Sequence, residues 1–411
     1  MSGLQAAPRA GTEPAETPKR ARAFIVLMGV VALFGDMTYE GARGLVGPWL
    51  AVLGASATAV GFAAGLGEFL GYGLRLVTGR IADRTRAWWP LVIGGYAVNL
   101  VAVPGLALVG SWQAAVGLLL LERIGKAIRS PARSTIVSYA ASQAGLGKSF
   151  GIEEALDQIG AVSGPLLTAS ALWVARGEAV STQYRVAFLV LLVPVVANLA
   201  CVFSARARYP NPEHFEQAEQ PRAPVGRLFH WYVAGAMLLA LGFADWALLA
   251  YHASRAGLLT AGELPLLYAG VMAIDALGAL GFGALFDRHG LLVLAVTSAV
   301  SAAFAPLVFL EPSPSLLIAG AACWAVGMGA QDSIFKAAIA KLVPKHERGR
   351  AYGVFFALFG LAWWVGSTLM GLLYERSLTS LAIFSAGAQL AAVPVLIFVG
   401  RRLARLERLG A

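Results

Sequence analysis

Residues 79–84 read GRIADR, and residues 283–288, which lie 204 positions later, read GALFDR. Each copy follows a long apolar stretch and closes on an Asp-Arg pair. A second echo lies 202 positions apart and pairs Gly147, Lys148, Phe150, Gly151, Ala155, Leu156 and Gly164 with Gly349, Arg350, Tyr352, Gly353, Ala357, Leu358 and Gly366. We therefore predict two related halves, produced by duplication of one helical unit.

Composition places this chain in a lipid bilayer. Its 411 residues are 58% hydrophobic and 13% charged, with a mean hydropathy of +0.69, whereas soluble domains carry about 25% charged residues. A membrane-crossing helix needs roughly 20 mostly apolar residues, which predicts an all-α polytopic protein with twelve spans in two six-helix bundles. We predict these spans at 23–52, 57–80, 88–110, 112–140, 149–175, 184–205, 230–254, 263–286, 290–310, 314–341, 350–375 and 379–401.

The polar segments divide the chain into domains. We expect residues 1–22 to be a disordered cytoplasmic N-terminus, 23–205 the first bundle, and 206–229 a cytoplasmic linker that holds four prolines. The second bundle is expected at 230–401, followed by a cytoplasmic C-terminus at 402–411.

The distribution of Lys and Arg predicts the orientation. Twenty of the 32 basic residues fall in the termini and even-numbered loops, and four fall in the other loops. Basic residues are retained in the cytoplasm, so both termini should lie there, in a multi-pass protein of the cell (inner) membrane. The net charge of +9 is spread over loop ends, which argues against nucleic acid as a partner.

The repeated corner resembles the loop signature of the major facilitator superfamily, and the resemblance extends over the whole chain. The second copy has Gly283, Asp287, Arg288 and Gly290; the first has Gly79, Asp83 and Arg84, with Arg86 where the last Gly is expected. The resemblance implies that this corner latches the halves in the outward-facing state. The alternative is a positively charged turn that only fixes topology.

The fifth predicted span resembles the antiporter signature of that superfamily, which many proton-driven exporters share. It contains Gly151, Gly160, Gly164 and Pro165, and Thr168-Ala169 replace the final Gly pair. The alternative is a close-packed, bent span without antiport meaning.

Six charged residues fall in or near the middle third of predicted spans: Asp36, Glu40, Glu68, Arg123, Asp245 and Asp275. Arg43 follows Glu40 by three residues, so Asp36, Glu40 and Arg43 should share one helical face. Charges at this depth are costly and face protein or water. Arg123 and the following Gly125 resemble the intramembrane Arg signature of the family, which implies a part in proton coupling.

We expect Asp36, Glu40 and Glu68, balanced by Arg123, to form the proton and substrate site of the first half, and Asp245 and Asp275 to line the second. Structural ion pairs are the alternative for each.

Further charges lie nearer the cytoplasm. Lys126, Arg129 and Arg133 follow Arg123 along the fourth span, and Glu153, Glu154 and Asp157 begin the fifth; Asp332 and Lys336 are one turn apart in the tenth. The first group predicts either a structural salt-bridge cluster or a vestibule for an anionic substrate. The second is either an internal pair or a gate.

These features predict a secondary transporter that exports a small molecule, a drug or a metabolite, by proton antiport. The alternative is proton-coupled uptake or facilitated transport of a small metabolite, anionic if the basic stripe contacts it. We expect no enzymatic activity, cofactor or metal site, since no catalytic arrangement, metal-ligand spacing or Walker sequence is present. A monomer is expected, with a small-molecule substrate, protons and the bilayer as partners.

Overall fold

The computed structural model describes residues 18–144, 146–211, 226–343 and 348–409, and within them every regular element is an α-helix. The bounds are α1 (Pro18–Val52), α2 (Ala57–Thr85), α3 (Trp88–Gly105), α4 (Trp112–Ala144), α5 (Leu146–Val174), α6 (Val180–Leu189), α7 (Leu192–Arg208), α8 (Arg227–Gly242), α9 (Trp246–Arg255), α10 (Glu263–His289), α11 (Leu292–Ser301), α12 (Phe304–Phe309), α13 (Pro314–Leu342), α14 (Arg348–Arg376) and α15 (Leu378–Leu409).

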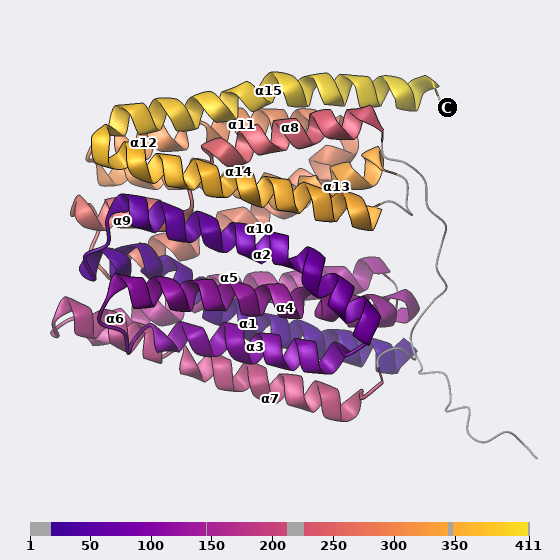
Figure 1. Ribbon diagram of the computed structural model, residues 1–411, viewed down its shortest axis with the longest axis horizontal. Coiled ribbons are helices and arrows are strands. Elements are labelled where there is room, and N and C mark those ends of the chain that lie inside the picture. Colours follow the sequence, from indigo (N-terminus) through magenta and orange to yellow (C-terminus); the bar gives the residue numbers. More distant parts are fainter. Residues whose placement is uncertain (1–17, 145, 212–225, 344–347, 410–411) are drawn as a thin grey trace, which may run out of the picture.

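These helices form twelve passes that run side by side along the long axis of the molecule (Figure 1). Three passes consist of two helices in series, namely α6 with α7, α8 with α9 and α11 with α12. Eight passes are long and apolar enough to cross a membrane by length and composition alone. The others are α2 to α5, and α4 carries several charged residues near its middle. The predicted all-α, twelve-span fold is confirmed.

The two halves repeat the same close helix contact. A Cβ atom on Gly164 of α5 would collide with the main-chain oxygen of Met37 on α1, and one on Gly366 of α14 would collide with that of Leu241 on α8. Since Gly366 lies 202 positions after Gly164 and Leu241 lies 204 after Met37, both contacts follow the repeat seen in the sequence. Figure 1 shows α1 with α3 to α7 in one half and α11 to α15 in the other.

The halves pack tightly at the end of the bundle remote from Pro18, which we call the outer end. Tyr251 of α9 donates to the main-chain oxygen of Ala55 at 3.1 Å. The N–H of Thr58, in the first turn of α2, donates to Glu375 Oε1 of α14 at 3.0 Å. Gly47 of α1 lies directly against the backbone of α9. These contacts join the first half to the second.

Several predicted boundaries shift. Helix α1 begins at Pro18, so residues 18–22, placed in a disordered N-terminus, are helical. Helix α15 continues to Leu409, through most of the predicted C-terminal tail 402–411. Residues 1–17 and most of the predicted linker, 212–225, lie outside the described part of the chain.

Candidate functional site

An ion pair joins the two halves at the centre of the molecule. Arg43 Nη2 of α1 lies 3.3 Å from Asp245 Oδ2 in the second half and 3.6 Å from Glu68 Oε1 of α2. All three side chains are at most 10% exposed. A single guanidinium therefore holds carboxylates from both halves.

Asp245 occupies this position because the seventh pass is broken there. Residues 243–245 are not helical, and Asp245 is the N-cap of α9, where its Oδ1 accepts from the N–H of Ala247 at 3.0 Å. The sequence predicted a span at 230–254; the structure has one pass there, and this pass is interrupted at 243–245. The break leaves one carboxylate oxygen for the helix end and the other for Arg43.

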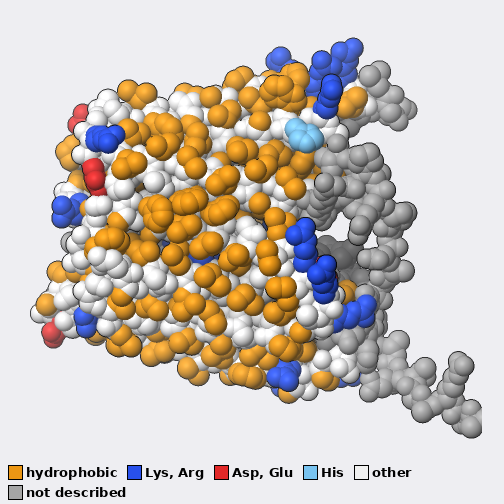
Figure 2. All heavy atoms as spheres, in the orientation of Figure 1, with side chains coloured by type: hydrophobic (Ala, Val, Ile, Leu, Met, Phe, Trp, Pro, Cys, Tyr) orange, Lys and Arg blue, Asp and Glu red, His pale blue; other side chains and the backbone are white. Residues whose placement is uncertain are grey.

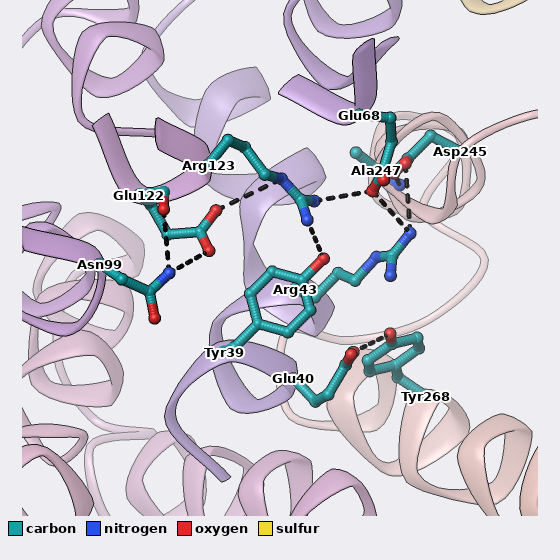
Figure 3. Close-up of polar contacts among 10 residues, drawn as sticks. All are labelled: Tyr39, Glu40, Arg43, Glu68, Asn99, Glu122, Arg123, Asp245, Ala247 and Tyr268. Atoms are coloured by element: carbon teal, nitrogen blue, oxygen red, sulfur yellow. Dashed lines mark hydrogen bonds and ion pairs between the residues drawn. The ribbon is translucent and has the colours of Figure 1, made fainter. Parts of the chain in front are cut away.

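The same network extends through Glu68 into the first half. Arg123 Nη2 of α4 lies 3.0 Å from Glu68 Oε1, and Arg123 Nε lies 3.3 Å from Glu122 Oε2. Arg123 also donates to the Tyr39 hydroxyl. Asn99 of α3 donates to Glu122 Oε1 at 2.6 Å (Figure 3).

The charges of this network alternate in sign. Its chain of contacts runs from Asp245 through Arg43, Glu68 and Arg123 to Glu122, so each guanidinium contacts two carboxylates. A buried charge without a partner is strongly destabilising. Each of these charges therefore depends on its neighbours in the network.

A second contact between the halves lies beside it. The Tyr268 hydroxyl of α10 donates to Glu40 Oε2 of α1 at 2.5 Å, and Figure 3 shows this pair next to Arg43. Asp36, Glu40 and Arg43 were expected to share one helical face. Glu40 and Arg43 nevertheless bind different partners.

Two cavities lie near the network. A small one of about 40 Å³ is lined by Arg43, Glu122 and Arg123 together with apolar residues of α1 to α4. A larger one, of about 740 Å³, extends toward the end at which α1 begins, and α1, α2, α4, α5, α10 and α13 line it. The network lines the small cavity only.

The larger cavity collects most of the remaining predicted site residues. Asp36, Glu40, Lys126, Arg129, Asp157, Asp275, Asp332 and Lys336 all line it. Asp275 is 5% exposed and its Oδ1 has no hydrogen-bond partner. Asp36, which the sequence analysis grouped with Glu68, thus lies apart from the ion pairs around Glu68, and Asp275 lies apart from Asp245.

The charges of the fourth and fifth spans separate into two kinds. Arg133 pairs with Glu153 at 2.5 Å and reaches Asp157 at 4.0 Å. Lys126 and Arg129 make no ion pair within the described residues; each lies over an aromatic ring, Lys126 Nζ 3.8 Å from the centre of Tyr39 and Arg129 Cζ 4.2 Å from that of Tyr96. Asp332 and Lys336 form no ion pair, with each other or with any other described residue.

The repeated corner is preserved with a different backbone in each copy. Gly290 has φ +60° and ψ −145°, a conformation that only glycine readily adopts. Arg86, at the corresponding place, has φ +50° and ψ +22°, a left-handed conformation that other residues tolerate at some cost. The acidic and basic residues of both copies, Asp83, Arg84, Asp287 and Arg288, are exposed, and Gly79 and Gly283 are partly buried.

The glycines of the fifth span serve helix packing. A Cβ on Gly160 would collide with the main-chain oxygen of Leu33, as one on Gly164 would with that of Met37. Both glycines therefore let α5 lie directly against α1. Pro165 lies inside α5, and Gly151 lies near the start of that helix.

The sequence analysis did not identify three residues in and beside the network: Glu122, Asn99 and Tyr268. Glu122 directly precedes Arg123 near the middle of a span, so its depth was a usable signal. Asn99 is a polar residue within an apolar stretch. Nothing in the sequence singles out Tyr268. Within the described residues no group of His, Cys, Asp and Glu is arranged to hold a metal ion.

Twelve membrane-crossing helices in two repeated halves, with buried charges and cavities between them, define a polytopic membrane transporter. Residues 233–409 match the Major Facilitator Superfamily. The chain is 38% identical over 384 residues, 92% of each chain, to an uncharacterised protein of Mycobacterium tuberculosis. It is 30% identical over 178 residues, 43% of each chain, to an uncharacterised MFS-type transporter of Methanocaldococcus jannaschii.

Solved transporter structures share the fold. A mutant of the nucleoside transporter NupG aligns with a TM-score of 0.73 at 13% identity, covering 92% of this chain and 99% of that one. A POT family transporter in complex with a thioalcohol conjugated peptide aligns with a TM-score of 0.74 at 13% identity, covering 92% and 96%. The second half of the chain therefore belongs with the major facilitator superfamily, and the whole chain has the fold of these transporters. It is a secondary transporter and not an enzyme.

Proposed function

We propose that this transporter exports a small organic solute in exchange for protons, and that the network around Arg43 couples the two movements. The observation that carries this proposal is the position of Arg43, which binds Glu68 in the first half and Asp245 in the second at the same time. The halves of an alternating-access carrier must separate at one end and close at the other.

Protonation supplies a switch for that movement. A proton on Glu68 or Asp245 removes one of the charges that Arg43 holds and weakens the contact between the halves. The neighbouring Arg123 can then keep Glu68 or release it to Arg43, since both guanidinia contact Glu68 Oε1. Proton binding and the arrangement of the halves are therefore linked in the proposal.

The closed outer end and the large cavity at the other end correspond to a carrier open toward the side of its termini. By the distribution of Lys and Arg we propose that this side is the cytoplasm of the cell membrane. The exposed corners at Asp83 and Asp287 lie in helices α2 and α10 near this side. We propose that they approach one another when the cavity closes, and that glycines of α5 maintain the packing during the movement.

A direct test begins with the solute. Purified protein is screened by thermal shift against a library of metabolites and drugs, because a ligand of the folded state raises the melting temperature. Hits are then added to everted vesicles holding an imposed pH gradient, acidic inside. Antiport predicts that a hit enters the vesicles and dissipates the gradient, and that Arg43→Gln abolishes both effects. Accumulation that is indifferent to the pH gradient would contradict proton coupling.

The second candidate function is uptake of an anionic metabolite. It is favoured by the three cations that line the large cavity from the first half without an ion pair in the described chain, namely Arg75, Lys126 and Arg129. In this case hits would be anions, and the same vesicles would release them or fail to accumulate them. The charge of the hits and the direction of movement separate the two functions.

A further inference from the structure

The large cavity is lined by acidic residues that do not belong to the ion-pair network around Arg43. Asp275 of α10 and Asp332 of α13 line it from the second half, and Glu40 of α1 and Glu154 of α5 from the first. Clusters of acidic residues are common on proteins. This cluster differs because one of its members, Asp275, is buried and has a carboxylate oxygen without a hydrogen-bond donor.

Asp275 is buried without a partner. Its side chain is 5% exposed, and Oδ1 has no hydrogen-bond donor. Helix α13 comes close at this point because residue 329 is glycine, and a Cβ there would lie 3.3 Å from Asp275 Oδ1. Within the described residues no Lys or Arg forms an ion pair with Asp275. Leaving a carboxylate ionised, buried and unpaired costs several kcal/mol, and either a bound proton or the positive group of a ligand removes that cost.

Two cations that line the same cavity, Lys336 and Arg75, lie beside other side chains. Lys336 lies one helical turn beyond Asp332 on α13, the spacing at which side chains on one helix face interact. Arg75 lies with Cζ 5.0 Å from the centre of the Tyr72 ring. Both line the cavity, and neither contacts Asp275.

An aromatic recess adjoins this cavity. A space of about 140 Å³ shares Arg75, Asp332 and Lys336 with the large cavity. Its other walls include Tyr72, Phe335, Phe356, Phe359 and Trp363, and Tyr72 stacks on Phe356 with ring centres 5.2 Å apart. Aromatic faces bind apolar groups and attract cations.

We propose that Asp275 is the binding site for the positive group of the transported solute, an organic cation whose apolar body occupies the aromatic recess. This inference rests on the proposed transport function and adds the charge class of the solute. It assigns the coupling proton and the solute to separate places, the Arg43 network and Asp275.

The test uses two ions of one shape and opposite charge, tetraphenylphosphonium and tetraphenylborate. Binding to the purified full-length protein in an uncharged detergent is measured by titration calorimetry, with no pH gradient, so the result does not depend on transport. We expect the phosphonium to bind and the borate to bind at least tenfold more weakly. Asp275→Asn should weaken phosphonium binding at least tenfold. Glu263→Gln, which removes an exposed carboxylate from the same helix, should leave it unchanged.

Folding and specificity are controlled separately. Asp275→Glu keeps the charge and should retain part of the affinity, and melting temperatures show whether each variant is folded. Equal binding by wild type and a folded Asp275→Asn would overturn the assignment, as would preference for the borate or failure of both ions to bind the wild type. If the wild-type protein binds the phosphonium but shows no transport driven by a pH gradient, the coupling proposal is wrong and the assignment of Asp275 stands.

Discussion

Asp245 binds the N-terminus of its own helix with one oxygen and Arg43 of the opposite half with the other. The two contacts, 3.0 Å to the N–H of Ala247 and 3.3 Å to Arg43 Nη2, serve different purposes. The first stabilises α9 locally. The second joins the halves, and it alone requires a negative charge, so substitutions can separate the two.

Asp245→Asn should fold and fail to couple. Asparagine is as good an N-cap as aspartate, so the start of α9 survives, whereas Asp245→Ala removes the cap as well and should cost about 1 kcal/mol more. We expect both variants to lose pH-driven transport, and only the alanine variant to show the added loss in melting temperature. Transport by Asp245→Asn at the wild-type rate would show that the charge is not needed.

The equivalent glycines of the two halves should be equally intolerant of a side chain. Gly164→Ala and Gly366→Ala each place a methyl group against a main-chain oxygen of the facing helix. Such overpacking costs about 1 to 3 kcal/mol, more than the ~1 kcal/mol that alanine gains over glycine in a helix. Melting temperatures and transport should fall in both variants.

Two further glycines provide the control for this prediction. Gly117 in α4 and Gly387 in α15 have no atom within 4 Å of an added Cβ, so alanine there should leave stability unchanged or slightly raised. If Gly164→Ala behaves like Gly117→Ala, the close contact between α1 and α5 is not needed for the fold.

The basic residues of α4 should separate into a structural and a functional type. Arg133 pairs with Glu153 at 2.5 Å and both are largely buried, so Arg133→Gln leaves a carboxylate unpaired and should lower the melting temperature. Arg129 has no ion pair within the described chain. Arg129→Gln should retain more stability, and reduced affinity for anionic hits in that folded variant would support the uptake alternative. Equal destabilisation by both variants would place Arg129 in the structural cluster.

The sequence predicted the number of passes and the repeat because both depend on properties summed over many residues. Hydropathy over 20 positions is insensitive to the rotation of a helix, and the Gly164 and Gly366 pair follows directly from the 202-residue echo. Contacts of single charges depend on helix rotation and on irregular backbone. Glu40 and Arg43 are one turn apart and find different partners, Tyr268 and Asp245, and the break at residues 243–245 interrupts an apolar run that reads as continuous.

The contact between Thr58 and Glu375 should act as a latch on the outer end. Glu375 Oε1 accepts from the main-chain N–H of Thr58 in the first turn of α2, where a negative charge is favoured by the unpaired amides of the helix end. Glu375→Gln keeps the shape and removes the charge. Glutamine still accepts this hydrogen bond, so the variant removes only the charge at the helix N-terminus, which contributes up to about 1 kcal/mol. The population open at the outer end should therefore rise up to about fivefold.

Accessibility of a buried position near that end measures the change. Leu50 lines the small cavity beside Arg43 and is 1% exposed. Leu50→Cys, in a chain with Cys201→Ala and Cys323→Ala, should therefore react with a water-soluble maleimide only when the outer end opens. Labelling should be up to about fivefold faster with Glu375→Gln. Glu311→Gln, at an exposed site between α12 and α13, should leave the rate unchanged. Identical rates in all three backgrounds would mean that Glu375 does not hold the outer end closed.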